Sequence, residues 1–166
     1  MKIGILSDTH GNLSTTESAA QLFAEADVEA VLHCGDIGGN EVLIELAIVL
    51  YPLGIPIYAV LGNVDGSFRD WKFISTLAGV QRMGRFGEVK FDGKRIAFLH
   101  SDDQLRFQEA VFSEQYDFVF TGHSHAVHDH TIKNTRCINP GTAGMGSPNT
   151  CAILDLTSGE LTILHP

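Results

Sequence analysis

The sequence predicts one α/β domain built on two packed β-sheets. Apolar runs of strand character alternate with helical segments up to residue 79, and this alternation is typical of βαβ units that form a parallel sheet. After residue 84 a hairpin pattern follows, and the last third reads as short strands joined by turns. We therefore expect a mainly parallel first half and a mainly antiparallel second half, in a single domain covering residues 1–166.

The first half contains three strand-like runs, each followed by a helical segment. Expected strands cover residues 2–7, 30–35 and 56–62, and expected helices cover residues 14–26, 41–54 and 68–79. Ser14 and Glu17 have the spacing of a capping box, which places the start of the first helix at Ser14. Apolar residues at helical spacing predict the buried face of that helix: Ala19, Leu22, Phe23 and Ala26.

Turn residues organise the second half. Asp92-Gly93 separates two apolar runs and predicts a hairpin over residues 87–101. A helix is expected over residues 103–115, and a strand over residues 117–122. The remaining strands are expected within residues 128–141 and 150–166, with turns at Lys133-Asn134 and Ser158-Gly159.

Composition narrows the class of protein. A chain of 166 residues buries on folding about two-thirds of the surface that it exposes when unfolded, so its core is stable without disulfide bonds. The cysteines are odd in number, widely spaced and without a CxxC pair, which argues against a disulfide framework and a zinc-thiolate site. We expect three reduced, mostly buried thiols, at Cys34, Cys137 and Cys151.

The charge and the first residues suggest partners and location. Eleven Lys and Arg against twenty Asp and Glu give a net charge of -9, so a groove for a long nucleic acid is not expected. The stretch "IGIL" is too short for a signal-peptide core or a membrane span. We therefore expect a cytoplasmic protein without a membrane partner.

Polar side chains follow five strand-like runs, at the point where each run ends. In an open α/β sheet, ligands bind outside the carboxyl ends of the strands, so we expect these side chains to converge. Asp and Asn are also common at helix caps and in turns, so one such residue alone is weak evidence for a binding site. The prediction therefore rests on the whole group of residues. The group offers oxygen and nitrogen ligands without thiolate: Asp8, His10, Asp36, Asn63, Asp65, His100, His123 and His125.

This set is too large for one catalytic metal ion. Such an ion usually takes about three protein ligands and keeps one position open. Two ions sharing a carboxylate would use the whole set. Asp36 is the expected shared ligand, because its strand is central and the glycines at 35, 38 and 39 let backbone approach closely.

The stretches "DTHG", "GDI", "GNVD", "LHS" and "GHSH" resemble the ordered motifs D-x-H, G-D, G-N-x-D, H and G-H-x-H of calcineurin-like metallophosphoesterases. The chain is similar in particular to small single-domain bacterial and archaeal phosphodiesterases of that superfamily, from Lys2 to its end. The resemblance implies a four-layer α/β/β/α sandwich of two mixed sheets flanked by helices. It also implies a structural role near the site for "INPGT" at 138–142.

The resemblance further implies a dinuclear phosphodiesterase that hydrolyses small phosphodiesters through a metal-bridging hydroxide. Asp36, Asn63 and His123 would act in catalysis, with His123 stabilising developing negative charge. Two divalent ions are expected, with Mn²⁺ preferred and Ni²⁺, Fe, Zn²⁺ or Mg²⁺ left open. The implied ligands are Asp8, His10 and His125 for one metal, Asn63, His100 and His123 for the other, and Asp36 for both.

Two departures from the family pattern affect the substrate side. Val64 stands where many relatives have the His of G-N-H-D/E, a proposed proton donor, so activity should favour diesters with good leaving groups. His100 is retained, but Ser101 stands where relatives commonly have Gly after this His, and Asp102 and Asp103 follow where an H-G-H sequence is frequent. The two carboxylates either cap the next helix, which we favour, or contact substrate.

Other polar residues leave alternatives open. Asp65 either orients a neighbouring ligand or caps the helix near residue 67. His33 is expected to be a buried strand residue with a backbone partner, rather than a support for a metal ligand. A further set has the residue types of a metal-binding triad, His128, Asp129 and His130, but we favour an exposed hairpin for this segment.

Two rival functions remain. A non-catalytic scaffold with the same fold, like the related retromer subunit, is expected to lose metal ligands, whereas this chain matches all seven family positions. A phosphomonoesterase is disfavoured by Val64. A homo-oligomer is also left open, with the aromatic stretch at residues 68–73 as a candidate interface.

Overall fold

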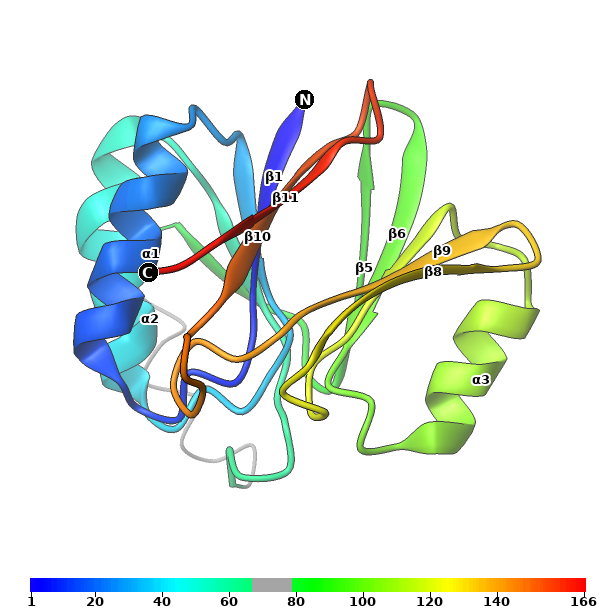
Figure 1. Ribbon diagram of the computed structural model, residues 1–166, viewed down its shortest axis with the longest axis horizontal. Coiled ribbons are helices and arrows are strands. Elements are labelled where there is room, and N and C mark those ends of the chain that lie inside the picture. Colours follow the sequence, from blue (N-terminus) through cyan, green and yellow to red (C-terminus); the bar gives the residue numbers. More distant parts are fainter. Residues whose placement is uncertain (67–78) are drawn as a thin grey trace.

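The computed structural model describes residues 1–66 and 79–166. A six-stranded sheet has the order β11-β10-β1-β2-β3-β4 (Figure 1). Strands β1 to β4 run parallel, while β10 is antiparallel to β1 and β11 is antiparallel to β10. The strands are β1 (Lys2–Leu6), β2 (Ala30–His33), β3 (Ile57–Ala59), β4 (Val80–Arg82), β10 (Cys151–Asp155) and β11 (Leu161–Leu164).

A second sheet of five strands has the order β5-β6-β7-β9-β8. It is mixed, because β7 is parallel to both β6 and β9, whereas β5 and β8 are antiparallel edge strands. Its strands are β5 (Phe86–Phe91), β6 (Lys94–Leu99), β7 (Phe118–Phe120), β8 (Val127–Ile132) and β9 (Thr135–Pro140).

The second half is mainly antiparallel, as expected, because its pairings other than those of β7 are antiparallel; the exception is β7, which is parallel to both of its neighbours. Helix α3 (Gln104–Phe112) supplies the crossover that lets β7 lie parallel to β6. The last two strands also leave this half and extend the first sheet beside β1. Pairing partners of this kind are set by the core that each strand completes, which local turn patterns do not encode.

Three apolar cores separate four layers. Helices α1 (Leu13–Glu25) and α2 (Asn40–Leu50) cover the outer face of the first sheet, and α3 covers the second sheet (Figure 1). Between the sheets, Ile5 and Leu32 pack with Phe98 and Phe120. This arrangement confirms the expected α/β/β/α sandwich of two mixed sheets.

Helix α1 begins earlier than expected. Asn12 lies in extended conformation and its Oδ1 accepts a hydrogen bond from Thr15 N at 3.3 Å, so Asn12 is the N-cap. The capping box at Ser14 is therefore wrong, because Ser14 already lies in the first helical turn. The expected stripe is partly confirmed, since Ala19 and Phe23 are fully buried.

Other local expectations are met within the described residues. Asp92 and Gly93 have φ angles of 47° and 79°, as the expected hairpin turn requires. Helix α2 ends at Leu50, and the next residues form a short 3₁₀ turn (Tyr51–Leu53) that contains a proline. The helix expected over residues 68–79 and the aromatic stretch at 68–73 lie outside the described residues, apart from Gly79.

The three cysteines are free and buried, as expected. Burial raises the pKa of the Cys151 thiol to about 12 and that of Cys137 to about 11, so neither forms a thiolate near neutral pH. None of the helices in the described part of the chain combines the length and apolar character needed to cross a bilayer.

Replacing the N-cap of α1 tests the assignment of its start. Asn12→Ala should lower the free energy of unfolding by about 1 kcal/mol, because the Thr15 amide loses its acceptor. Ser14→Ala, the control, should change it by less than about 0.5 kcal/mol. Urea denaturation of both variants measures the difference, and equal losses would contradict an N-cap at Asn12.

An ion pair between β9 and β8 of the second sheet predicts a pH-dependent contribution to stability. Arg136 Nε and Nη2 donate to Asp129 Oδ1 and Oδ2 at 2.8 and 2.7 Å, and this guanidinium lowers the pKa of Asp129 below its ordinary value of 3.8. A lowered folded-state pKa stabilises the fold above the unfolded value, and the gain is lost as pH falls through the folded value.

Asp129→Asn should therefore lower the free energy of unfolding at pH 7 by about 0.5 kcal/mol, a small amount because the pair is partly exposed. The difference from the original protein should shrink below about pH 4. Urea denaturation at pH 7 and at decreasing pH checks this. A difference that does not change with pH would show that charge is not the cause.

Candidate metal centre

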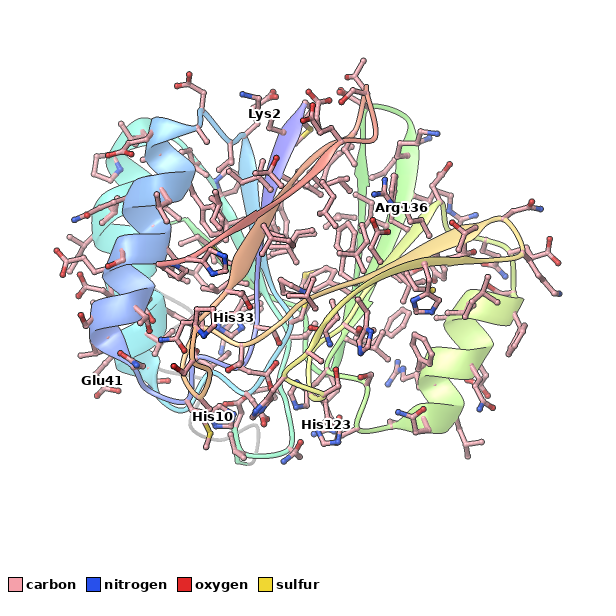
Figure 2. All side chains as sticks on the ribbon, viewed as in Figure 1. Lys2, His10, His33, Glu41, His123 and Arg136 are labelled. Atoms are coloured by element: carbon pink, nitrogen blue, oxygen red, sulfur yellow. The ribbon has the colours of Figure 1, made fainter. Side chains whose placement is uncertain are left out.

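The polar loops meet at one end of the two sheets. Strands β1, β2 and β3 deliver residues 7–12, 34–39 and 61–66 to this end, and β6 and β7 deliver residues 100–103 and 121–126. Figure 2 shows His10 and His123 at this end, while Lys2 lies at the opposite one. The convergence expected from strand ends is thus observed.

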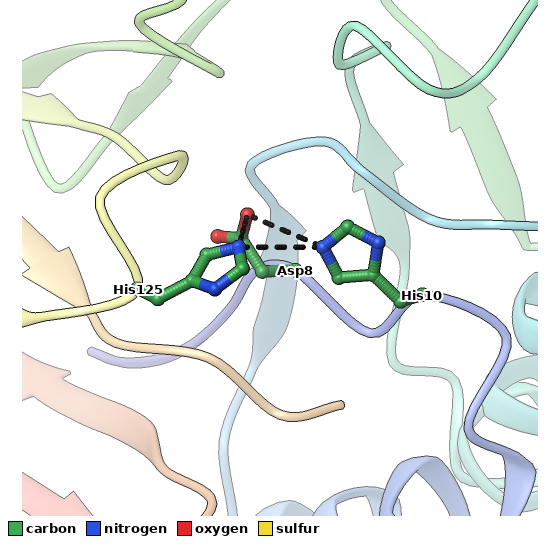
Figure 3. A group of neighbouring side chains, drawn as sticks. All are labelled: Asp8, His10 and His125. Carbon is green, nitrogen blue, oxygen red and sulfur yellow. Dashed lines mark hydrogen bonds and ion pairs between the residues drawn. The ribbon is translucent and has the colours of Figure 1, made fainter. Parts of the chain in front are cut away.

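One group of ligand atoms comes from Asp8, His10 and His125 (Figure 3). Asp8 Oδ1 lies 3.2 Å from His125 Nε2 and 3.9 Å from His10 Nε2. The two Nε2 atoms lie 3.3 Å apart. Three electron-rich atoms that face one another in this way have the spacing and chemistry of a site for one cation.

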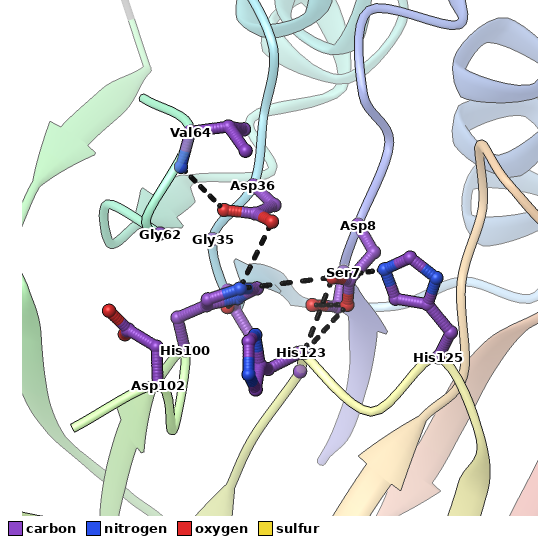
Figure 4. Close-up of polar contacts among 12 residues, drawn as sticks. Ser7, Asp8, Gly35, Asp36, Gly62, Val64, His100, Asp102, His123 and His125 are labelled. Atoms are coloured by element: carbon purple, nitrogen blue, oxygen red, sulfur yellow. Dashed lines mark hydrogen bonds and ion pairs between the residues drawn. The ribbon is translucent and has the colours of Figure 1, made fainter. Parts of the chain in front are cut away.

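A second group comes from Asp8, Asp36 and His100 (Figure 4). His100 Nδ1 lies 3.0 Å from the Cys34 carbonyl oxygen and donates to it, so Nε2 carries a lone pair. Nε2 is buried and has no hydrogen-bond partner among the described residues. It points at Asp36 Oδ2, 3.2 Å away.

This lone pair shows that the residues fit a metal ion. A bare nitrogen facing a carboxylate oxygen is unfavourable unless a proton or a metal cation lies between them. Ligating histidines commonly donate their other ring N–H to a backbone carbonyl, as His100 does. The donor set of imidazole and carboxylate suits divalent ions such as Mn²⁺, Fe²⁺, Ni²⁺ or Zn²⁺.

Both buried carboxylates lie between His10 and His100. Asp8 belongs to both groups of ligand atoms, and Asp36 Oδ2 also approaches His10 Nε2 at 3.7 Å. The geometry therefore allows either carboxylate to be shared. The assignment of Asp36 as the bridge stays a prediction.

Asp8 is fully buried. Burial raises its pKa, and the Ser7 hydroxyl, which donates to Asp8 Oδ2 at 2.6 Å, acts in the opposite direction. The His123 amide also donates to Oδ2, at 3.1 Å. A bound cation would favour the ionised carboxylate further.

Two motif glycines leave room for the carboxylates. A Cβ at Gly62 would overlap Asp36 Oδ1 and the Asp36 amide nitrogen. A Cβ at Gly122 would overlap Ser7 Oγ and lie 2.7 Å from Asp8 Oδ2. The glycines of "GNVD" and "GHSH" are therefore required because the carboxylates approach the backbone itself.

The backbone at the site is strained. Positive φ is uncommon for residues other than glycine and costs of order 1 to 3 kcal/mol each where it persists. Five predicted ligands adopt it: Asp8 (54°), His10 (46°), Asp36 (51°), His123 (71°) and His125 (57°). Ser101, next to His100, has a φ of 70°.

His33 links the first two loops. Its Nδ1 accepts from Gly35 N at 3.2 Å, so Nε2 carries the proton and donates to Thr9 Oγ1 at 3.0 Å. Burial lowers the pKa of His33 to about 3, so the ring is neutral. The expected buried role with a backbone partner is confirmed, and the ring also supports the loops of Asp8 and Asp36.

Asp65 links the loop that carries Asp36 to the loop that carries Asn63. Its carboxylate accepts from Gly38 N at 2.9 Å and from Gly62 N at 2.7 Å. Val64 N donates to Asp36 Oδ1 at 3.1 Å (Figure 4). Asp65 thus holds the ligand loops through backbone amides rather than through a bond to a ligand side chain, and the alternative cap near residue 67 lies outside the described residues.

Asn63 and His123 lie at the rim. Both residues are exposed, and the His123 ring lies against His100 with centroids 5.1 Å apart. Neither residue belongs to the two groups of ligand atoms described above. Their roles as metal ligands stay predictions.

The residues after His100 have separate structural roles. Asp103 caps α3 by accepting from Arg106 N at 3.1 Å, which confirms capping for this residue. Asp102 instead forms an ion pair with Arg85. Ser101 Oγ donates to the Gly122 carbonyl at 3.2 Å. Arg85 lies outside every motif of the sequence, so no local pattern singles it out.

The segment at 138–142 supports the floor of the site. Asn139 Nδ2 donates to the Gly122 carbonyl at 2.8 Å, and Thr142 Oγ1 donates to the Asp8 carbonyl at 2.9 Å. The structural role implied for this segment is thus observed. On β8, Asp129 turns to Arg136, so it forms no metal triad with His128 and His130.

Comparisons with known proteins agree with this geometry. A family model described as the calcineurin-like phosphoesterase superfamily domain matches residues 1–159. A phosphodiesterase of Methanocaldococcus jannaschii is 32% identical over 144 residues, which cover 85% of this chain and 83% of that protein.

Solved structures show the same fold. A structure described as a novel archaeal phosphodiesterase has a TM-score of 0.85 and 29% identity, and each chain is covered completely. YfcE, a phosphoesterase from E. coli, has a TM-score of 0.69 and 20% identity over 99% of both chains. Zinc-bound Vps29 from Entamoeba histolytica has a TM-score of 0.63 and 17% identity over 98% of this chain and 90% of that one. The chain belongs to the calcineurin-like phosphoesterase superfamily, whose members are phosphoric ester hydrolases.

Proposed function

We propose that this protein is a dinuclear metal-dependent phosphodiesterase that hydrolyses small phosphodiesters in the cytoplasm. The observation that carries the proposal is the unpartnered, buried Nε2 of His100, which faces Asp36 in one of two adjoining groups of ligand atoms. A single cation would leave one of these groups uncompensated.

Each metal has a defined set of candidate ligands. Two divalent ions, with Mn²⁺ preferred, would lower the pKa of a water molecule to give a nucleophile and would offset the charge of the phosphate. The proposed ligands are Asp8, His10 and His125 for one ion, Asn63, His100 and His123 for the other, and Asp36 for both.

The protein's own groups hold and orient the reactants. The strained, hydrogen-bonded backbone keeps Asp8 and Asp36 in place, which limits reorganisation during the reaction. His123 is exposed beside His100, where its ring would face the second ion and the substrate side. With a net charge of -9, the chain would attract a small anion through the bound cations rather than through its own surface.

Val64 suggests which esters are cleaved. Its side chain is 49% exposed and carries no proton to give to a leaving group. A general acid typically contributes 10² to 10⁴ in rate, and this help matters most for poor leaving groups. We therefore propose a preference for phosphodiesters with good leaving groups over phosphomonoesters.

The second candidate is a non-catalytic scaffold. The fold likeness to Vps29 structures is the observation that favours it, but at 17 to 18% identity this likeness concerns the fold alone. A scaffold has no need to maintain five strained ligand residues. The two functions differ in turnover by the metal-loaded protein.

Restoring metal to stripped protein tests the function. Addition of Mn²⁺, Ni²⁺, Mg²⁺ or Zn²⁺ separately should restore cleavage of a chromogenic aryl phosphodiester well above that of its monoester. Asp36→Ala should abolish this turnover and reduce the metal content, because a charged ligand is lost. No turnover with any ion, despite two ions bound per chain, would favour the scaffold. Unchanged metal content and activity in Asp36→Ala would refute the site.

Adding an imidazole at position 64 tests the leaving-group argument. Val64→His should raise turnover of esters with alkyl leaving groups by up to about 10²-fold, because a general acid becomes available. Turnover of an aryl diester with a good leaving group serves as the control and should change little. Equal changes for both substrates would indicate an effect on binding rather than proton transfer.

A further inference from the structure

The five polar loops form a closed ring, and each neighbouring pair is joined by specific contacts. The loop of Asp8 is joined to that of Asp36 by backbone bonds, including His10 N to the Asp36 carbonyl at 3.0 Å. Asp65 joins the Asp36 loop to the Asn63 loop. Ser101 joins the His100 loop to the His123 loop, whose amide at His123 bonds back to Asp8.

Arg85 closes this ring between the Asn63 and His100 loops. Its Nη1 donates to the Gly62 carbonyl at 3.2 Å, and its Nη2 pairs with Asp102 Oδ2. Gly62 immediately precedes Asn63, and Asp102 lies two residues after His100. One guanidinium thus holds both loops.

The charge of the pair also suits its position. An unpaired cation beside a two-metal site would repel the ions. Asp102 neutralises Arg85, and its side chain is 22% exposed against 42% for Arg85. The pair therefore gives the rigidity of a planar, two-pronged contact without adding net positive charge.

The two loops that it joins carry ligands proposed for the same metal. Asn63 is an exposed, neutral ligand, so its affinity for a cation depends on being held at the correct distance from His100. We infer that Arg85 is a positioning residue for the second metal ion, acting through Gly62 and Asp102. This inference rests on the proposed dinuclear function.

Metal titration of Arg85 variants tests this inference. Calorimetric titration of the stripped protein with Mn²⁺ should show two ions per chain. Arg85→Gln should keep the affinity for the first ion and weaken the second about 10- to 100-fold, the usual effect of losing a group that orients a ligand. Asp102→Asn should act in the same direction. The double variant should bind the second ion no more weakly than Arg85→Gln does, because both changes break the same contact.

The chain offers a matched control. Arg136 makes the same kind of contacts, with the Gly159 carbonyl and the carboxylate of Asp129, and lies away from the labelled site residues (Figure 2). Arg136→Gln should leave both metal affinities unchanged. Arg85→Lys keeps the positive charge but loses the planar guanidinium group, so its affinity for the second ion should lie between those of Arg85→Gln and the original protein. Thermal unfolding of each variant identifies any that fail to fold, and Asp102→Asn then carries the test.

Several outcomes would overturn the inference. Two ions bound to Arg85→Gln as tightly as to the original protein would exclude a positioning role. A higher KM with unchanged metal affinity would make Arg85 a substrate contact instead. Binding of fewer than two ions by the original protein would refute the dinuclear function itself, and this result is distinct from a defect confined to the variants.

Discussion

The main physical constraint on this structure is that electron-rich atoms face one another at one end of its two sheets, where they repel unless a positive charge lies between them. Asp8 and Asp36, 0% and 3% exposed, face imidazole nitrogens at 3.2 to 3.9 Å. His100 donates to a backbone carbonyl through Nδ1, and its buried Nε2 has no hydrogen-bond partner among the described residues. Buried negative charge without a counter-ion is costly, and a cation suits both the carboxylate oxygens and the imidazole nitrogens.

Much of the surrounding chain serves this arrangement. Left-handed backbone at five predicted ligands turns their side chains inward directly after the strands. Glycines at positions 62 and 122 let the carboxylates approach the backbone. The four-layer sandwich offsets the strain, because its three buried cores hold the strand ends from which the loops emerge.

The departures from the family pattern have different consequences. Val64 changes the side chain above the site, yet its amide still holds Asp36, so the metal ligands do not depend on the missing imidazole. Asp102 and Asp103 replace family residues by carboxylates that the structure uses within the protein, one toward Arg85 and the other as a helix cap. Both changes concern the substrate side and the outer supports, whereas the candidate ligands are retained.

Local sequence patterns encode the alternation of strands and helices in the first half, the hairpin at Asp92-Gly93 and the polar residues at strand ends. These features are encoded within about ten neighbouring residues, through periodicity, turn chemistry and the ends of apolar runs. The parallel placement of β7 between β6 and β9, the sharing of Asp8 between both groups of ligand atoms, and the contacts of Asp65 and Arg85 depend instead on tertiary structure. Those contacts join segments that lie far apart in the chain, and their partners are chosen by the packing of the two sheets rather than by any local pattern.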